Sequence, residues 1–323
     1  MATLAELCKK YRAAISELGA EHYSGSDSAA AYELEARARY ATLRGRADEA
    51  KGLLAAAAAY RDFERECLQV LGRAVNSGEY ERGDVAYLLL YQHGIATDTT
   101  SERDMHLELF ESYLDLLLRD EALDVTEESL MRASLIGQYS LGTRRPWRAR
   151  RHAERLAVLL VILEGKAMAR PKASHALVLA GFYAEVSDLR RAASLALIAA
   201  DTYARWGYEK DAADALYTAL RYEAVLPPSM RKISESEVRV RLGERAAEVL
   251  AAASRPALKR DEVEHTAEFI GSYDEVMEAV MDRAEAEGYT LPQSIWRIQR
   301  EELARRGITW RDPGIMNPGV KFD

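Results

Sequence analysis

Apolar residues recur at intervals of three and four along almost the whole chain, the spacing that gathers them on one face of an α-helix. Alternation with a period of two, which is typical of strands, is nearly absent. The pattern therefore predicts an all-α fold. Cap and breaker residues divide it into about fourteen helices, over residues 2–18, 27–44, 47–76, 82–93, 101–120, 126–141, 146–169, 172–186, 189–206, 209–225, 230–254, 258–270, 273–287 and 292–306.

Several predicted helices begin with a capping signal, in which a Ser or Thr side-chain oxygen accepts a hydrogen bond from a free backbone N–H of the first turn. The signals are S-x-x-E at Ser234 and Ser272, and T-x-x-Q at Thr290 with Pro292 in the first turn. The links between successive helices are short, which makes neighbouring helices antiparallel. The chain is therefore expected to be a run of antiparallel helical hairpins stacked as an α-solenoid.

The helical pattern covers residues 1–307, with candidate subdivisions near 95–100 and 142–146. The last stretch, 308–323, breaks the pattern, because the prolines and glycines around it argue against a helix. Burial is nevertheless expected for its large apolar residues, which are Ile308, Trp310, Ile315, Val320 and Phe322. This irregular tail is expected to pack on the helical body or on a partner, a second copy of the chain included.

Composition narrows the class of protein. Hydrophobic residues make up 48% of the chain and charged residues 30%, which fits a folded protein with a real core. No apolar run approaches the roughly 18 residues that span a bilayer, and the charged N-terminus is unlike a secretory signal, so we expect a cytoplasmic protein without a membrane partner. Abundant Arg and acidic residues with few amides are one signature of proteins from thermophiles, although a GC-rich genome would also favour Arg.

One stretch, YARWGYEKDAADALYTALRYEAV, places five residues at a known spacing, namely Tyr203, Gly207, Ala212, Leu216 and Ala219. In this it resembles the second half of a tetratricopeptide repeat. The resemblance implies that Gly207 turns the chain between two helices and that the small alanines let those helices approach closely. It also implies binding of a protein or peptide on a concave surface, with the polar residues Arg205, Lys210, Asp214 and Arg221 as candidate contacts.

A second stretch, YATLRGRADEAKGLLAAAAAYRD, repeats the resemblance with Gly45, Ala50, Leu54 and Ala57, while its tyrosine, Tyr40, lies one residue too early. The two matches are not separated by a whole number of the roughly 34-residue repeats, and the Trp and Leu-Gly landmarks of the first repeat helix are absent. The expectation is therefore an irregular helical-repeat protein, similar to tetratricopeptide-repeat proteins.

The segment GTRRPWRARRHAER holds six arginines in a chain whose formal net charge is −8. If a helix starts at Pro146, then Arg148, Arg151 and Arg155 share one face that points away from the core. Arg144 and Arg145 extend this stripe, and Trp147 is placed to stack on a base or an arginine, or to fill the core. Positive side chains at a helix N-terminus oppose the helix dipole, so these arginines need an acidic neighbour.

Three kinds of acidic neighbour remain open for the arginines. The first is internal, for example the acidic segment that starts at Asp120. The second is an acidic protein or peptide, and the third is RNA or DNA. The overall negative charge argues against a dedicated nucleic-acid module, because such modules usually carry a basic balance.

Candidate chemistry is sparse. Cys8 and Cys67 have no CxxC spacing and are expected to be buried thiols. The glycine spacing from Gly137 imitates a phosphate-binding loop, but the Lys-Ser pair is missing. Glu262 and His265 lie three residues apart on a predicted helix, without the partner ligands that a di-iron site needs. We therefore expect no catalytic residue, cofactor or metal.

These observations together predict a scaffold or adaptor that binds a protein or peptide. Its candidate contacts are the arginine stripe and the residues around the best repeat match. The first alternative is a factor associated with RNA or ribonucleoproteins, which would bind phosphates with the arginines. An enzyme with an unrecognised all-α active site, for example around Glu262 and His265, is the second.

Overall fold

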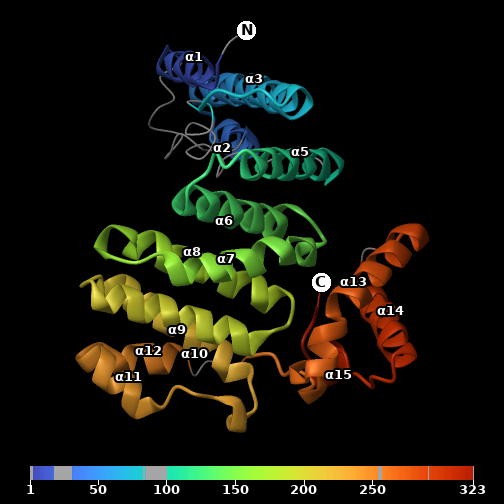
Figure 1. Cartoon of the computed structure of the whole chain (residues 1–323). Helices are drawn as coiled ribbons and strands as arrows, with labels where there is room; N and C mark the ends of the chain where they lie inside the picture. The colour runs from blue at the N-terminus through green and yellow to red at the C-terminus, as the bar shows by residue number, and fades with distance from the viewer. Residues whose placement is uncertain are drawn as a thin grey trace. The chain divides into compact units, whose positions relative to one another are not determined.

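The computed structural model describes residues 3–17, 31–82, 84, 100–253, 257–289 and 291–322, and all regular structure in them is helical (Figure 1). The prediction of an all-α fold is confirmed for this part of the chain. The chain divides into two compact units, Met1–Thr143 and Arg144–Asp323. The division falls within the candidate range 142–146, while the other candidate range, near 95–100, lies almost entirely outside the described residues.

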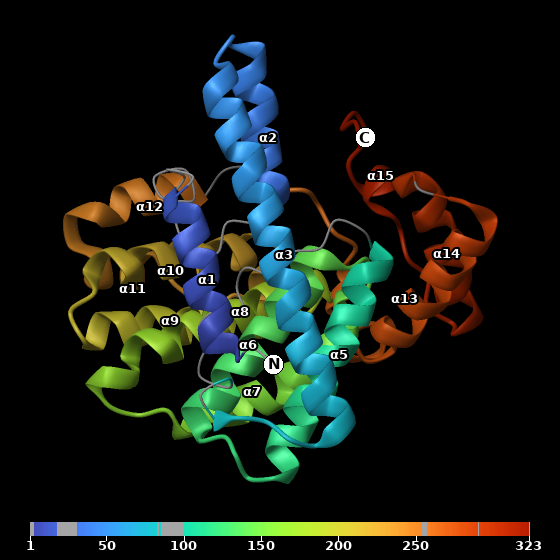
Figure 2. The same cartoon turned by 90° about the horizontal axis from the view of Figure 1, so that it is seen from above.

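Unit 1 is organised around one long helix. Its helices are α1 (Leu4–Glu17), α2 (Ala31–Leu43), α3 (Ala47–Ser77), α5 (Thr100–Arg119) and α6 (Val125–Gly142). Figure 2 shows α2 and α1 lying along successive stretches of α3. Tyr11 of α1 stacks on Phe63 of α3 with ring centroids 4.8 Å apart. The glycine spacing at Gly137 falls inside α6, so it forms no phosphate-binding loop.

In unit 2 the predicted helix 146–169 is interrupted. A 3-10 turn, η2 (Pro146–Ala149), leads into α7 (Arg150–Ile162), and a second, η3 (Lys166–Met168), leads into α8 (Ala169–Glu185). The chain changes direction at Gly165, whose φ of +94° favours glycine. Helices α9 (Leu189–Arg205) and α10 (Glu209–Val225) begin where the sequence predicts.

Helices α8, α9 and α10 pack through small residues, and Figure 1 shows them as successive layers. The alanines between them are almost fully buried, among them Ala173, Ala176, Ala180, Ala192, Ala196, Ala199, Ala213 and Ala219. Small side chains let helix backbones approach closely. The same kind of turn joins α8 to α9 and α9 to α10. In the first turn Ser187 has positive φ, and the next residue, Asp188, donates its backbone N–H to Tyr183 O at 2.8 Å. In the second turn Gly207 has positive φ, and Tyr208 N donates to Tyr203 O at 3.0 Å. This pattern is the Schellman motif.

The predicted helix 230–254 is replaced by three shorter elements, which are α11 (Glu235–Leu242), η5 (Gly243–Arg245) and α12 (Ala246–Ala253). The 3-10 turn η4 (Pro228–Met230) ends where the predicted helix begins. The predicted cap at Ser234 is confirmed, since its side chain accepts a hydrogen bond from Glu237 N at 3.2 Å. The helix stops early because Gly243 adopts a φ of +54°.

The predicted helices 258–270 and 273–287 were divided at the wrong place. Residues 257–261 form no regular element, 262–265 form the 3-10 turn η6 (Glu262–His265), and the chain then enters α13 (Ala267–Glu287) with Thr266 as the cap. Ser272 lies inside α13, so the predicted cap there is wrong; its hydroxyl donates to Phe269 O at 3.1 Å instead. Helix α14 (Pro292–Arg305) has Pro292 in its first turn as predicted, whereas Thr290 is outside the described residues.

The C-terminal tail folds onto α13 and α14. Ile308 and Trp310 are buried in a core that includes Phe269, Val276 and Ile298. The expectation of a wholly irregular tail is wrong, because Pro313–Met316 forms the one-turn helix α15. Asp312 caps this turn and Pro313 occupies its first position, where a missing backbone donor costs nothing.

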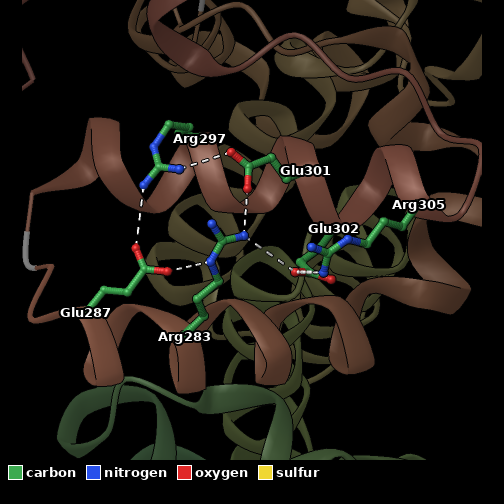
Figure 3. A network of polar contacts seen from close by, with 6 residues as sticks. All are labelled: Arg283, Glu287, Arg297, Glu301, Glu302 and Arg305. Carbon is green, nitrogen blue, oxygen red and sulfur yellow. Dashed lines mark hydrogen bonds and ion pairs between the residues drawn. The ribbon is translucent and has the colours of Figure 1, made fainter.

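Charged residues join the outer surfaces of α13 and α14 (Figure 3). Arg283 of α13 donates at 2.6 Å both to Glu287 and to Glu301 of α14. Glu301 also accepts from Arg297 at 3.0 Å, and Glu302 pairs with Arg305. Each exposed pair contributes little by itself, but the shared partners fix the alignment of the two helices.

Candidate functional site

The arginine segment lies at the start of unit 2, across η2 and α7. Arg144, Arg148, Arg151 and Arg155 are exposed, so the stripe points away from the core as predicted. Arg145 differs from the others, because it is 9% exposed. The α-helix begins at Arg150 and not at Pro146, since Pro146–Ala149 is a 3-10 turn.

Arg145 is held by three carboxylates of α13. Its guanidinium donates to Glu278 at 2.6 Å, to Asp282 at 2.8 Å and to Glu285 at 2.9 Å. The planar guanidinium offers five N–H donors, which allows one side chain to serve three acceptors. Arg148 also pairs with Glu278. These contacts show that α13 is an acidic neighbour of the segment.

Trp147 and Arg150 extend the contact with α13. The indole N–H of Trp147 donates to Glu278 at 2.6 Å, and its ring meets Tyr273 edge-on with centroids 6.5 Å apart. Arg150 pairs with Asp274, with one N–O distance of 2.6 Å. Trp147 therefore fills the core of unit 2, which was one of its three predicted roles. A role of Trp147 and Arg145 in partner binding stays a prediction.

The acidic residues of α13 form one stripe. Asp274, Glu278, Asp282 and Glu285 follow one another at intervals of four, four and three residues, which puts them on one helical face. Sequence reasoning did not single them out, although an acidic stripe on a predicted helix is a signal that complements an arginine stripe. More than 120 residues separate the two stripes, so nothing in the linear sequence pairs them.

The shared contacts keep the network ionised. Burial by itself would raise the pKa of Glu278, but hydrogen bonds from Arg148 and Trp147 and the charge of Arg145 hold it below its usual value. Burial would likewise lower the pKa of Arg145, yet hydrogen bonds and charges of the α13 carboxylates raise it. The network is therefore charged at neutral pH and fastens the start of unit 2 to α13.

Helix α7 presents a second, mostly aliphatic surface, which we name the α7 outer face. It consists of Val158, Val161 and Ile162, with Arg155 one turn and Arg151 two turns nearer the N-terminus. Spacings of three and four place all five side chains on one face. The exposed fractions of Val158, Val161 and Ile162 are 54%, 74% and 55%. Branched aliphatic residues gathered in this way are typical of an interaction surface.

The residues implied by the repeat resemblance lie on α9 and α10. Lys210, Asp214 and Arg221 share one face of α10, and Arg205 lies in the last turn of α9. Arg205, Lys210 and Asp214 are exposed, and Arg221 is half-buried. Their role in binding stays a prediction.

Glu262 and His265 lie in the 3-10 turn η6, where residues three apart are eclipsed. Glu262 is exposed and His265 is buried, and both line a cavity of about 280 Å³ in unit 2. Cys8 and Cys67 are both buried, as predicted. Within the described ranges no group of three or more His, Cys, Asp or Glu side chains is arranged to hold a metal ion.

Comparison with known proteins finds no match, neither among family models nor among curated proteins or solved structures. Among the described helices none is long and apolar enough to cross a membrane. The geometry of the chain itself is therefore the basis for a functional proposal.

Proposed function

We propose that this protein is a cytoplasmic scaffold or adaptor that binds a protein partner on the α7 outer face. The observation that carries the proposal is the exposure of Val158, Val161 and Ile162 side by side on one helix. Because these side chains are already partly buried, burying the rest of each one against a partner contributes about 1–2 kcal/mol. The partner that fits is an amphipathic helix with an aliphatic face and acidic residues at the end that meets Arg151 and Arg155.

We also propose that the helices stack as an irregular, tetratricopeptide-like solenoid. Two features support this arrangement. The Schellman turns at Gly45 and Gly207 lie where the repeat resemblance puts its glycines, and both have positive φ. The alanines of the better match, Ala212 and Ala219, are buried between neighbouring helices.

A charge substitution tests the α7 outer face. Val161→Asp places a carboxylate in the middle of the aliphatic surface, where a partner would have to bury it unpaired. The matched control is Val240→Asp on α11, because Val240 is 86% exposed and also lies on a helix of unit 2. Both substitutions are at exposed positions, so both chains are expected to fold.

The wild-type and variant chains are used to capture proteins from a lysate, with and without nuclease, and the retained proteins are identified. We expect a set of proteins that survives nuclease, is lost with Val161→Asp and is retained with Val240→Asp. Retention of the whole set by Val161→Asp would contradict the proposed surface. Loss of the set on nuclease treatment would move the function to ribonucleoprotein binding.

A further inference from the structure

The cavity of about 280 Å³ in unit 2 is not needed for the proposed scaffold. It lies where the end of α10, the segment before η6, η6 itself and the C-terminal tail come together. Asn317 joins the tail to the segment before η6, since its side chain accepts from Lys259 N at 2.7 Å and donates to Lys259 O at 2.9 Å. The cavity is therefore built from three separate stretches of sequence.

Part of the lining of the cavity is apolar. It is formed by Val225 and Leu226 at the end of α10, by Leu258, and by Met316 of the tail. Leu226 is almost fully buried, whereas Leu258 is half exposed at the rim. A cavity just under the about 300–1,000 Å³ of drug-sized sites suits a short aliphatic group.

Three cationic side chains line the same cavity, Lys259, Arg260 and Arg311. Arg311 is oriented by the buried Asp261, which accepts from its backbone N–H at 2.7 Å and from Nε at 3.1 Å. Arg260 is held loosely, with Glu264 and Ser187 each 3.4 Å from Nη1. Both carboxylates have other donors, because Asp261 caps η6 and Glu264 accepts from Trp310 Nε1 at 2.9 Å.

His265 is the buried polar group of the cavity. The residue is 6% exposed, and it lines the cavity. Among the residues that the structure describes, none hydrogen-bonds its imidazole. Burial first, and then the charge of Arg260, lower the pKa of His265, whereas Glu262 raises it. A neutral imidazole without a partner offers one donor and one acceptor to a molecule in the cavity.

We propose that this cavity binds an aliphatic carboxylate, with the carboxylate on Arg260, Arg311 and Lys259, a hydrogen bond to His265, and the aliphatic group against Leu226 and Met316. A guanidinium pairs with a carboxylate through parallel hydrogen bonds. Glu262 on the wall repels ligands with two or more negative charges, which favours a monoanion over a phosphate. The carboxylate belongs either to a small aliphatic acid or to the C-terminus of a peptide that ends in an aliphatic residue.

The test compares N-acetyl-leucine with N-acetyl-leucinamide, which lacks the negative charge, by calorimetric titration of the full chain. We expect the acid to bind at least tenfold more tightly than the amide. Shifts of the His265 imidazole resonances on titration locate the binding. Isovalerate and a short peptide ending in leucine separate the two sources: equal affinity for isovalerate indicates a small acid, and tighter binding of the peptide indicates a C-terminus.

Two variants assign the carboxylate to the cavity. Arg260→Gln with Lys259→Gln is expected to weaken binding of N-acetyl-leucine at least tenfold, while the control Lys232→Gln, at an exposed lysine that does not line the cavity, leaves it unchanged. Neither change touches the pairing of Arg311 with Asp261, so the tail stays in place. Two results would overturn the proposal. One is equal affinity for the acid and the amide. The other is no binding of the acid at about 10 mM, a concentration that detects binding free energies of only about 3 kcal/mol.

Discussion

Among single residues, Arg145 carries the largest share of the contact between the start of unit 2 and α13. It serves Glu278, Asp282 and Glu285 at once, and without it these three carboxylates would repel one another along one helical face. Hydrogen bonds to charged groups are worth more than those between neutral groups. Asp282 and Glu285 are exposed, however, so solvent screens their share of the interaction. Arg145 is therefore first a structural residue.

Replacing Arg145 by Gln is expected to lower the free energy of unfolding of unit 2 by about 2 kcal/mol, because a donor to three carboxylates is lost. Urea unfolding followed by tryptophan fluorescence measures this change selectively, since all four tryptophans lie in unit 2. The control is Arg144→Gln at the exposed neighbouring position, where a change below about 0.5 kcal/mol is expected. Equal effects of the two substitutions would show that the network adds nothing to stability.

A second prediction at the scale of residues concerns His265 and the pH dependence of stability. Its pKa in the folded protein lies below the ordinary value of 6.5, chiefly because of burial. Between these two pKa values the unfolded chain binds more protons than the folded one, so the free energy of unfolding rises with pH. The contribution of His265 is complete above pH 6.5 and is lost as the pH falls towards the folded pKa.

Comparing wild type with His265→Gln isolates this effect, because the other titrating groups are common to both chains. On acidification from pH 7.5 to 5, the wild type is expected to lose more stability than the variant, by at most about 1.4 kcal/mol for each pH unit of pKa shift. Urea unfolding at several pH values measures the difference. Parallel pH profiles would mean that His265 has an ordinary pKa.

At the scale of elements, the conformation of the turn between α9 and α10 requires a glycine at position 207. Its φ is +78°, a left-handed conformation that costs an L-residue about 1–2 kcal/mol. Gly181 provides the comparison, because it lies inside α8 and a Cβ added there meets no heavy atom within 4 Å. Gly207→Ala is expected to destabilise unit 2 by about 1–2 kcal/mol, and Gly181→Ala to stabilise it by about 0.5–1 kcal/mol. Tryptophan-monitored unfolding of both variants checks the opposite signs.

The elements that the sequence predicts well are those whose boundaries are set locally. The starts of α3, α9, α10 and α14 agree with the predicted ranges, because glycine turns, caps and Pro292 mark them within a few residues. The prediction failed between 258 and 273, where tertiary contacts decide the local structure. Asp261 ends the irregular segment there by capping η6, and it also holds Arg311 of the tail, 50 residues later.

The candidate site likewise has a part that the sequence predicts and a part that depends on tertiary contacts. The sequence identified the arginine stripe, and its exposure at Arg151 and Arg155 follows from the spacing of an α-helix. It did not identify the partner acids on α13, the insertion of Trp147 into the core, or the cavity, because each of these depends on segments that are distant in sequence. Thermophilic origin and pairing of two copies through the tail stay predictions.

At the scale of the whole molecule, negative charge restricts the choice of partner. The formal net charge is −8, and Arg145, Arg148 and Arg150 are already paired with carboxylates of α13. A nucleic acid would have to compete with these carboxylates, which are covalently part of the chain and thus present at high effective concentration. It would also approach a molecule of the same sign of charge.

We therefore expect no binding of a single-stranded RNA of about 30 nucleotides at about 10 μM protein in 0.15 M salt, where non-specific binders show dissociation constants of about 10⁻⁴–10⁻⁶ M. Fluorescence polarisation of a labelled RNA measures this. Micromolar binding would contradict the expectation if its dissociation constant rises steeply with salt and if the double substitution Arg151→Gln with Arg155→Gln abolishes it. The exposed arginines of α7 would then be a phosphate-binding site. If RNA is not bound while a protein set is retained by the α7 outer face, then the arginines of this segment divide into two groups: Arg145, Arg148 and Arg150 fasten α13, and Arg151 and Arg155 flank a surface for protein.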